Sequence, residues 1–381
     1  MSYELLIDSQ QVKEYCQQAA TKPAIAVDTE FVRTRTLYPQ LGLIQLYDGE
    51  RLVLVDPIAV DDLQPVAELL TNPDVVKILH SCSEDLEAFQ VALNVMPSPI
   101  FDSQFAAGIV EIGSMLGYAK LVETMLGIEV DKGESRTDWL ARPLSPKQLD
   151  YAAKDVLYLF QLYPQLKQQV EDKDRLSWVY EEMEQLCNKK RAVLPNELAY
   201  LNIKNAWQLQ GQSLSTLQAL AAWRMRVAQE RNIALNFVVK EHNLLALAKR
   251  KPSAKSSLYA IEDLHPQDIR KFGDDIIEVI ESCANTEETL PLVNVERLVD
   301  MAQYKSISQQ VRKLCVGAAE DLNIPVELLG SKKQINQLLS WYWFKQDELK
   351  ARGLKPDLLQ GWRATYLADA ILDVLDPSVS A

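Results

Sequence analysis

The sequence lacks the features that mark membrane-spanning, secreted and zinc-binding proteins. No apolar run approaches the roughly 18 residues of a membrane span, and the first ten residues, MSYELLIDSQ, hold neither a basic stretch nor a long apolar segment. The five cysteines are scattered without a CxxC pair, and there are only three histidines among 381 residues. These absences favour a cytoplasmic location with reduced thiols, and they favour oxygen ligands over zinc ligands at any metal site.

The length and the charge distribution indicate several domains of different character. A chain of 381 residues exceeds one ordinary domain, so two or three are expected. The net charge of -13 belongs wholly to residues 1–199, which carry 18 Lys+Arg against 31 Asp+Glu, whereas residues 200–290 and 291–381 each carry 11 of both signs. An acidic balance does not exclude a phosphate-containing substrate, because bound divalent cations supply local positive charge.

The first half of the sequence alternates strand and helix patterns. Four apolar runs have the length and composition of strands: 24–27, 41–47, 51–57 and 75–80. The sequence Asp48-Gly49-Glu50 between two of these runs predicts a hairpin. Residues 83–93 have helical spacing. A mixed sheet flanked by helices, and hence an α/β domain, is the expected result.

A helix start is predicted at Ser145, where Gln148 completes a capping box. The helix is expected to extend to about Leu166. Tyr151 lies four residues before Asp155, so this spacing places a phenol and a carboxylate on one face of the helix.

Beyond about residue 170 the strand patterns end and helix-forming sequence takes over. Two helical stretches are expected, over about 210–290 and 295–376. NIALNFVVKEHNLLAL, beginning at Asn232, can be aligned with NIPVELLGSKKQINQLL, beginning at Asn323. This similarity, together with the equal lengths of the two stretches, predicts an internal duplication.

Four acidic residues stand beside apolar runs in three separate segments: Asp28 and Glu30 in AIAVDTEF, Asp85 in HSCSEDLEAF, and Asp155 in YAAKDVLYLF. Asp28 and Glu30 share one face of a strand, and two adjacent carboxylates repel each other unless a cation bridges them. Taken singly, each motif also fits a solvated strand end, a helix N-terminus or a helix surface. Taken together, carboxylate oxygens suit Mg²⁺ or Mn²⁺ and predict a two-metal phosphoryl-transfer enzyme.

The order of these motifs resembles that of the DEDD 3′–5′ exonucleases in their tyrosine variant. HSCSEDLEAF, SRTDWLARPLS and DYAAKDVLYL narrow the resemblance to the bacterial ribonuclease D family, and LLGSKKQINQLL and LLQGWRATYL are similar to parts of HRDC domains. The resemblance covers essentially the whole chain. It implies a ribonuclease H-like α/β exonuclease domain over 1–190, with a mixed sheet and flanking helices, followed by two all-α HRDC domains over 208–290 and 295–376.

The resemblance also implies roles for individual residues. Carried over by position, Asp28, Glu30, Asp85 and Asp155 are the metal-binding carboxylates, and Tyr151 orients or helps to deprotonate the attacking water. Two divalent ions, Mg²⁺ or Mn²⁺, are the implied cofactors, and such a pair serves both ends of an in-line displacement. A tyrosine, with an unperturbed pKa of about 10, is a poor base at neutral pH, so orientation is the favoured role.

Three further polar residues near these motifs are interpreted as structural. His80 stands at a strand end, whereas the histidine of a related exonuclease variant occupies the place held here by Tyr151. Asp102 has the context of a helix cap, and Glu111 that of a surface residue.

Substrate contacts are expected from basic, amide and aromatic residues near the motifs, because cations meet phosphates and rings stack on bases. The candidates are Arg33, Gln45, Lys132, Arg136, Trp139 and Arg142. Each cation alone also fits a solvated surface charge. In the helical half, 249–255 and 331–345 are basic and aromatic, and at least two of the four adjacent aromatic residues over 341–344 are expected in the core.

The expected function is metal-dependent removal of nucleotides from RNA 3′ ends with release of 5′-mononucleotides. The resemblance implies transfer RNA 3′ maturation, with transfer RNA precursors or other structured RNA carrying 3′ extensions as the partner. No membrane and no stable protein partner is implied. The residues alone support only metal-dependent phosphodiester hydrolysis. A DNA 3′–5′ exonuclease would use the same carboxylates, and a non-catalytic nucleic-acid-binding scaffold, a class that tends to lose them, is the other alternative.

Overall fold

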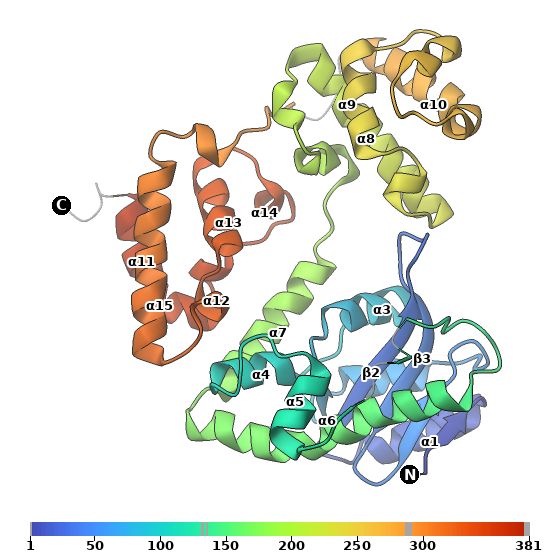
Figure 1. Ribbon diagram of the computed structural model, residues 1–381, viewed down its shortest axis with the longest axis vertical. Coiled ribbons are helices and arrows are strands. Elements are labelled where there is room, and N and C mark those ends of the chain that lie inside the picture. The colour runs from blue at the N-terminus through green and yellow to red at the C-terminus, as the bar shows by residue number, and fades with distance from the viewer. Residues whose placement is uncertain (1, 131–132, 135, 286–291, 377–381) are drawn as a thin grey trace.

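The computed structural model describes residues 2–130, 133–134, 136–285 and 292–376. An α/β domain over 4–191 is followed by two helical modules, the first over 196–285 and the second over 298–375 (Figure 1).

A six-stranded mixed sheet forms the centre of the α/β domain. In chain order its strands are β1 (Glu4–Leu6), β2 (Ala24–Val32), β3 (Gln40–Tyr47), β4 (Leu52–Val55), β5 (Val76–Leu79) and β6 (Ile100–Asp102). Their order across the sheet is β1-β4-β3-β2-β5-β6. β3 runs antiparallel to both of its neighbours, and the other pairs are parallel. The predicted hairpin is confirmed, since β3 and β4 pair with Tyr47 opposite Leu52.

β2 extends farther than its apolar run predicts. The strand continues past Asp28 to Val32 because β3 pairs with it along this length, with a register shift between Glu30 and Phe31. On the other side β5 pairs only with residues 24–26 of β2. Asp28 and Glu30 therefore lie within a paired strand whose opposite edge is open to other elements.

Seven helices belong to the α/β domain: α1 (Ser9–Ala19), α2 (Gln64–Thr71), α3 (Ser83–Leu93), α4 (Ser103–Ile109), α5 (Tyr118–Leu126), α6 (Pro146–Asp172) and α7 (Leu176–Arg191). α6 crosses the sheet and contacts β2, β3, β4 and β5 (Figure 1). The predicted capping box of Ser145 and Gln148 starts it. The helix passes the expected end near Leu166 because its buried face continues to Val170.

The helical half consists of two modules that repeat the same plan. The first contains η1 (Asn196–Asn202), η2 (Ala206–Gln208), α8 (Gly211–Arg231), η3 (Leu235–Phe237), α9 (Glu241–Arg250), η4 (Lys255–Ala260) and α10 (Pro266–Asn285). The second contains η5 (Leu298–Asp300), α11 (Tyr304–Leu322), α12 (Val326–Leu329), α13 (Lys332–Trp343), α14 (Glu348–Ala351), η6 (Asp357–Leu359) and α15 (Gly361–Leu375). α8 and α11 each end at an asparagine in the left-handed conformation, Asn232 with φ 45° and Asn323 with φ 50°. This shared geometry at the aligned positions supports the predicted duplication.

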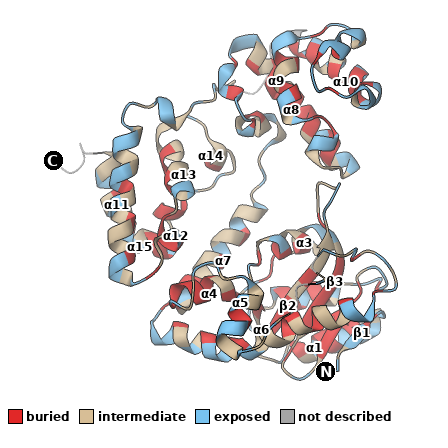
Figure 2. Ribbon diagram, viewed as in Figure 1, coloured by how far each residue is buried: buried red, intermediate tan, exposed pale blue. Residues whose placement is uncertain are grey.

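The two modules are joined to the α/β domain in different ways. The buried apolar residues of the second module form one continuous core with those of the α/β domain, whereas the first module has a core of its own. Figure 2 shows buried residues in all three parts of the chain. Trp178 of α7 stacks on Trp362 of α15 with ring centroids 4.6 Å apart, and the Arg363 guanidinium pairs with Glu182 of α7. Of the four adjacent aromatic residues, Phe344 is buried and Trp343 packs against this shared core.

The loop between β2 and β3 is the contact of the α/β domain with the first module. Leu37 packs against the core of that module. The Ala234 N–H donates to the Arg35 carbonyl over 2.8 Å, and the Tyr38 N–H donates to Asn232 Oδ1 over 3.0 Å. The strand that carries Asp28 and Glu30 therefore continues directly into a segment held by the first module.

All five cysteines are buried and none forms a disulfide. Within the described part of the chain, every helix falls short of the length and apolarity that a bilayer crossing requires.

Truncation of the aromatic stack tests the shared core. We expect Trp362→Ala to lower the free energy of unfolding by about 3–5 kcal/mol, and to reduce hydrogen-exchange protection of the β2 and β3 amides as well as of α15. Tyr259→Ala, at an exposed position of the first module, is the matched control and should change stability little. A continuous core would be contradicted if the amides of the second module lost their hydrogen-exchange protection while those of the sheet kept theirs in full.

Candidate active site

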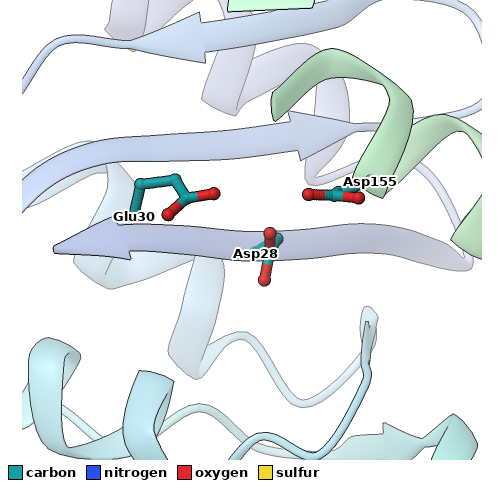
Figure 3. A group of neighbouring side chains, drawn as sticks. All are labelled: Asp28, Glu30 and Asp155. Atoms are coloured by element: carbon teal, nitrogen blue, oxygen red, sulfur yellow. The ribbon is translucent and has the colours of Figure 1, made fainter. Parts of the chain in front are cut away.

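Three carboxylates from two elements converge above the centre of the sheet. Asp28 and Glu30 extend from β2 and Asp155 from α6 (Figure 3). One ligand atom of each lies within 4.8 Å of the others. We call these three residues the carboxylate cluster. Two features of the sequence bring these side chains together. The two-residue spacing places Asp28 and Glu30 on one face of a strand, and the helix that follows the capping box carries Asp155.

Asp85 is not one of the three residues whose ligand atoms converge, but it lies near enough for its charge to raise the pKa values of Asp28 and Glu30. It lies in the first turn of α3, which contacts both β2 and β3. Its Oδ1 accepts a hydrogen bond from the Thr29 hydroxyl over 2.5 Å. Thr29 lies between the two acidic residues of the strand, so its side chain points to the opposite face. The sequence analysis missed Thr29, although the alternation of the strand could have identified it.

Burial raises the pKa of all four carboxylates, and mutual repulsion adds to this rise for Asp28 and Glu30. For Asp28 burial is the largest cause, followed by the charges of Asp85, Asp155 and Glu30. Burial and the charges of Asp155 and Asp85 raise the pKa of Glu30 to about 9. Burial also raises the pKa values of Asp85 and Asp155 to about 7, against hydrogen bonds from hydroxyl groups that favour the ionised forms.

This donor set fits divalent cations. Carboxylates that repel one another at close range are stable together as anions only when positive charge is added, and no lysine or arginine forms an ion pair with any of the four in the described part of the chain. Oxygen ligands without histidine or cysteine suit Mg²⁺ or Mn²⁺.

Tyr151 lies one helical turn before Asp155, as its spacing predicts, and hydrogen-bonds to that carboxylate. Tyr151 as a whole is half-buried. Burial, and then the negative charges of Asp155, Glu30 and Asp28, raise its pKa well above the usual value for tyrosine. The hydroxyl is therefore protonated at neutral pH, and the structure favours an orienting role over a basic one.

Tyr118 is a second tyrosine at the site that the sequence analysis did not single out. Its hydroxyl donates to the backbone carbonyl of Asp155 over 2.5 Å and lies 3.1 Å from that of Lys154. It therefore supports the turn of α6 that presents Asp155. No pattern within the sequence connects Tyr118, at the start of α5, to a helix that begins near residue 146.

The three residues interpreted as structural have ordinary structural contacts. His80 Nδ1 lies 2.9 Å from the Ser103 hydroxyl. Asp102 is the N-cap of α4, where it accepts from two backbone N–H groups, so this prediction is confirmed. Glu111 is exposed, as predicted, and pairs with Lys173 over 2.6 Å.

Arg142, predicted to contact substrate, instead makes its hydrogen bonds within the fold. Its Nε and Nη2 atoms each lie 2.7 Å from an oxygen of Asp56. The remaining donors bind the backbone carbonyls of Gly42, Trp139 and Ala141. All five guanidinium N–H groups are thereby used, and none is left for a phosphate. Arg142 holds the segment before α6 against the sheet.

Gln45 and Trp139 do not line an exposed groove, which corrects a second part of the substrate prediction. Gln45 is 0% and Trp139 1% exposed. The Trp139 backbone covers β3 at Gly42, where an added Cβ would come within 2.5 Å of the Trp139 carbonyl oxygen. Both side chains are interior because this long-range contact and α6 cover the strand, which no local pattern shows.

The other three substrate candidates have different outcomes. Arg33 forms an ion pair with Glu87 over 3.1 Å and also donates to the Leu37 carbonyl. Arg136 is exposed and forms no ion pair with the residues that the structure describes, so its contact with substrate stays a prediction. Lys132 lies outside the described residues.

The sheet, the carboxylate cluster and the two helical modules together are those of a 3′–5′ exonuclease with HRDC domains. The family model described as 3'-5' exonuclease matches residues 3–171. The HRDC domain model matches residues 213–280, and the model of the ribonuclease D C-terminal HRDC domain matches residues 302–371.

Full-length relatives narrow this class. The chain is 45% identical to ribonuclease D of Shewanella sp. (strain ANA-3) over 98% of this chain and 94% of the relative. It is 39% identical to ribonuclease D of Escherichia coli (strain K12) over 98% and 99% of the two chains. The chain belongs to the ribonuclease D family.

Solved structures agree on the fold. The crystal structure of Escherichia coli RNase D superimposes with a TM-score of 0.94 at 38% identity, covering 99% of this chain and 100% of that one. The catalytic core of RRP6 from Trypanosoma brucei has a TM-score of 0.60 at 18% identity, over 75% and 81% of the two chains, which is a likeness of fold alone.

The raised carboxylate pKa values predict that cation binding stabilises the protein more as pH rises. Without cations the folded chain keeps protons on Glu30, Asp85 and Asp155 up to pH values of about 7 to 9, whereas the unfolded chain releases them near pH 4. The free energy of unfolding of the metal-free protein therefore falls as pH rises from about 4 to about 9. We expect the increase in unfolding temperature on adding Mg²⁺ to be larger at about pH 9 than at about pH 6, as measured by thermal unfolding with Mg²⁺ or EDTA.

Asp155→Asn is the control for this prediction, because it removes one charge from the carboxylate cluster. The variant should be less sensitive to pH without metal and should respond less to Mg²⁺. An equal Mg²⁺ effect at both pH values in the unmodified chain would contradict the linkage.

Proposed function

We propose that the chain is a 3′–5′ exoribonuclease in which Asp28, Glu30, Asp85 and Asp155 hold two divalent cations, Mg²⁺ or Mn²⁺. The observation that carries this proposal is the carboxylate cluster, whose ligand atoms lie within 4.8 Å of one another under strong mutual repulsion. When bound, the cations supply the positive charge that acidifies the attacking water and stabilises the departing 3′ oxygen.

The chain's own residues then have positioning roles. The Thr29 hydroxyl fixes the Asp85 carboxylate, and the Tyr118 hydroxyl supports the turn that carries Asp155. Tyr151 stays protonated, so it orients the attacking water through its hydroxyl while also bonding to Asp155. The water's proton therefore leaves to solvent or to a group other than Tyr151.

We propose RNA with 3′ extensions, such as transfer RNA precursors, as the substrate. The Escherichia coli relative is described as an exoribonuclease involved in structured RNA processing. Residues 1–190 would carry out catalysis, and the helical modules over 208–290 and 295–376 would help to bind RNA. Among the predicted substrate contacts, Arg136 has the strongest support, because it is exposed. The unpaired cysteines support a cytoplasmic location.

Replacement of a cluster carboxylate tests the catalytic assignment. We expect Asp28→Asn to reduce RNA hydrolysis by at least about 1,000-fold, because it removes a ligand charge at the reacting centre. RNA binding, measured by fluorescence anisotropy, should stay within about threefold of the unmodified chain. Asp150→Asn, an exchange of the same kind at a half-buried position earlier in α6, is the matched control. Full activity in Asp28→Asn would refute the assignment.

A comparison of matched RNA and DNA oligonucleotides tests the choice between an exoribonuclease and a DNA exonuclease. With Mg²⁺ present, we expect single-strand RNA to be shortened from its 3′ end at least about tenfold faster than DNA of the same sequence, because a 2′-hydroxyl offers contacts that DNA lacks. The products can be resolved by gel electrophoresis. Equal rates would favour the DNA exonuclease.

A further inference from the structure

One buried polar side chain beside the carboxylate cluster has no hydrogen-bond partner. Gln45 lies in β3 and is 0% exposed, and neither its Oε1 nor its Nε2 bonds to any residue that the structure describes. An enclosed amide without a partner lowers stability. An apolar side chain of similar size would fill this space at a smaller cost, so the amide requires an explanation.

The register of the sheet places Gln45 beside Asp28. The two residues are direct partners across the antiparallel pair of β2 and β3. Cross-strand partners project from the same face, with Cβ atoms about 4.5–5.5 Å apart. The glutamine side chain is one methylene longer than that of aspartate, so its amide has the length to reach the Asp28 carboxylate. α6 contacts both strands and encloses the pair.

The Asp28 carboxylate accepts fewer hydrogen bonds from side chains than the Asp85 and Asp155 carboxylates do. The Thr29 hydroxyl donates to Asp85, and Tyr151 bonds to Asp155. For Asp28, the donor that lowers the carboxylate pKa is the backbone N–H of Thr29 and not a side chain. Carboxylates at metal sites are normally held by further donors, and loss of such a donor lowers metal affinity. The free amide and the donor-poor carboxylate are thus complementary neighbours.

We propose that Gln45 is a positioning residue for Asp28, whose carboxylate accepts a hydrogen bond from Gln45 Nε2 when a cation is bound. The inference rests on the proposed metal site. Gln45 is enclosed, so it acts through Asp28 and does not touch RNA. Its effect is to fix the orientation in which the Asp28 oxygens face the cation.

Gln45→Met is the test, because it keeps the side-chain length and removes the amide. Gln218→Met is the matched control, since Gln218 of α8 is also buried, with both amide atoms unpartnered, but lies in the first module. Each protein is titrated with Mn²⁺ by calorimetry, and its thermal unfolding is followed in EDTA. Hydrolysis of a single-strand RNA by each protein is then measured at saturating Mn²⁺.

For Gln45→Met we expect the Kd for Mn²⁺ to rise about 10–100-fold. We also expect a lower kcat, an unchanged KM for RNA, and an unfolding temperature in EDTA at least equal to that of the unmodified chain. Gln218→Met should keep the Mn²⁺ affinity and the kcat. A residue with a purely structural role would show the reverse, namely lower metal-free stability and unchanged Mn²⁺ affinity.

Three outcomes overturn the inference. Unchanged Mn²⁺ affinity in Gln45→Met refutes the positioning role while leaving the metal site intact. Loss of folding of Gln45→Met in EDTA refutes it as well, because the amide would then be needed by the fold itself. Absence of Mn²⁺ binding to the unmodified chain would refute the proposed metal site, and with it the role of Gln45.

Discussion

Mutual repulsion among Asp28, Glu30 and Asp155 is the constraint on which the rest of the α/β domain depends. Three carboxylates with ligand atoms within 4.8 Å oppose folding unless other interactions hold their backbones in place. The two elements that carry them are correspondingly well supported. β2 is paired with β3 along its length, and α6 begins with a capping box and buries its apolar face to its last turns. Because the backbone is held firmly, burial and this repulsion raise the proton affinity of Asp28 and Glu30 instead of separating the carboxylates.

The two helical modules have the same order of helices, but they are attached to the α/β domain in different ways. The second shares a core with the α/β domain through the stack of Trp178 on Trp362, so we expect the two parts to unfold as one unit. The first has a separate core and is held by the connecting chain, by the loop at Leu37 and by contact of its η1 with α14 of the second module. Two modules of one plan thus differ in how they are attached: the second shares its core with the α/β domain, and the first has a core of its own.

The site residues that could be predicted from the sequence are those whose relative positions follow from their spacing along one strand or one helix. Asp28 with Glu30, and Tyr151 with Asp155, are pairs whose relative position follows from strand or helix periodicity alone. Burial follows instead from contacts between distant segments. Arg142 has the composition of a phosphate ligand, yet every donor it has is used within the fold. Gln45 was predicted to line a groove, but it is buried because α6 covers the strand that carries it. The residues near Gln45 in the sequence give no sign of where α6 crosses the sheet.

The loop between β2 and β3 links the catalytic strand to the first module at a second point, in addition to the covalent connection. Leu37 fills part of that module's core, and the backbone of the loop is paired with the turn that begins at Asn232. The two segments have to change together during evolution, since a substitution in either one alters the fit of the other. A helical module exchanged between two relatives would therefore fit its new host only if the loop were exchanged with it.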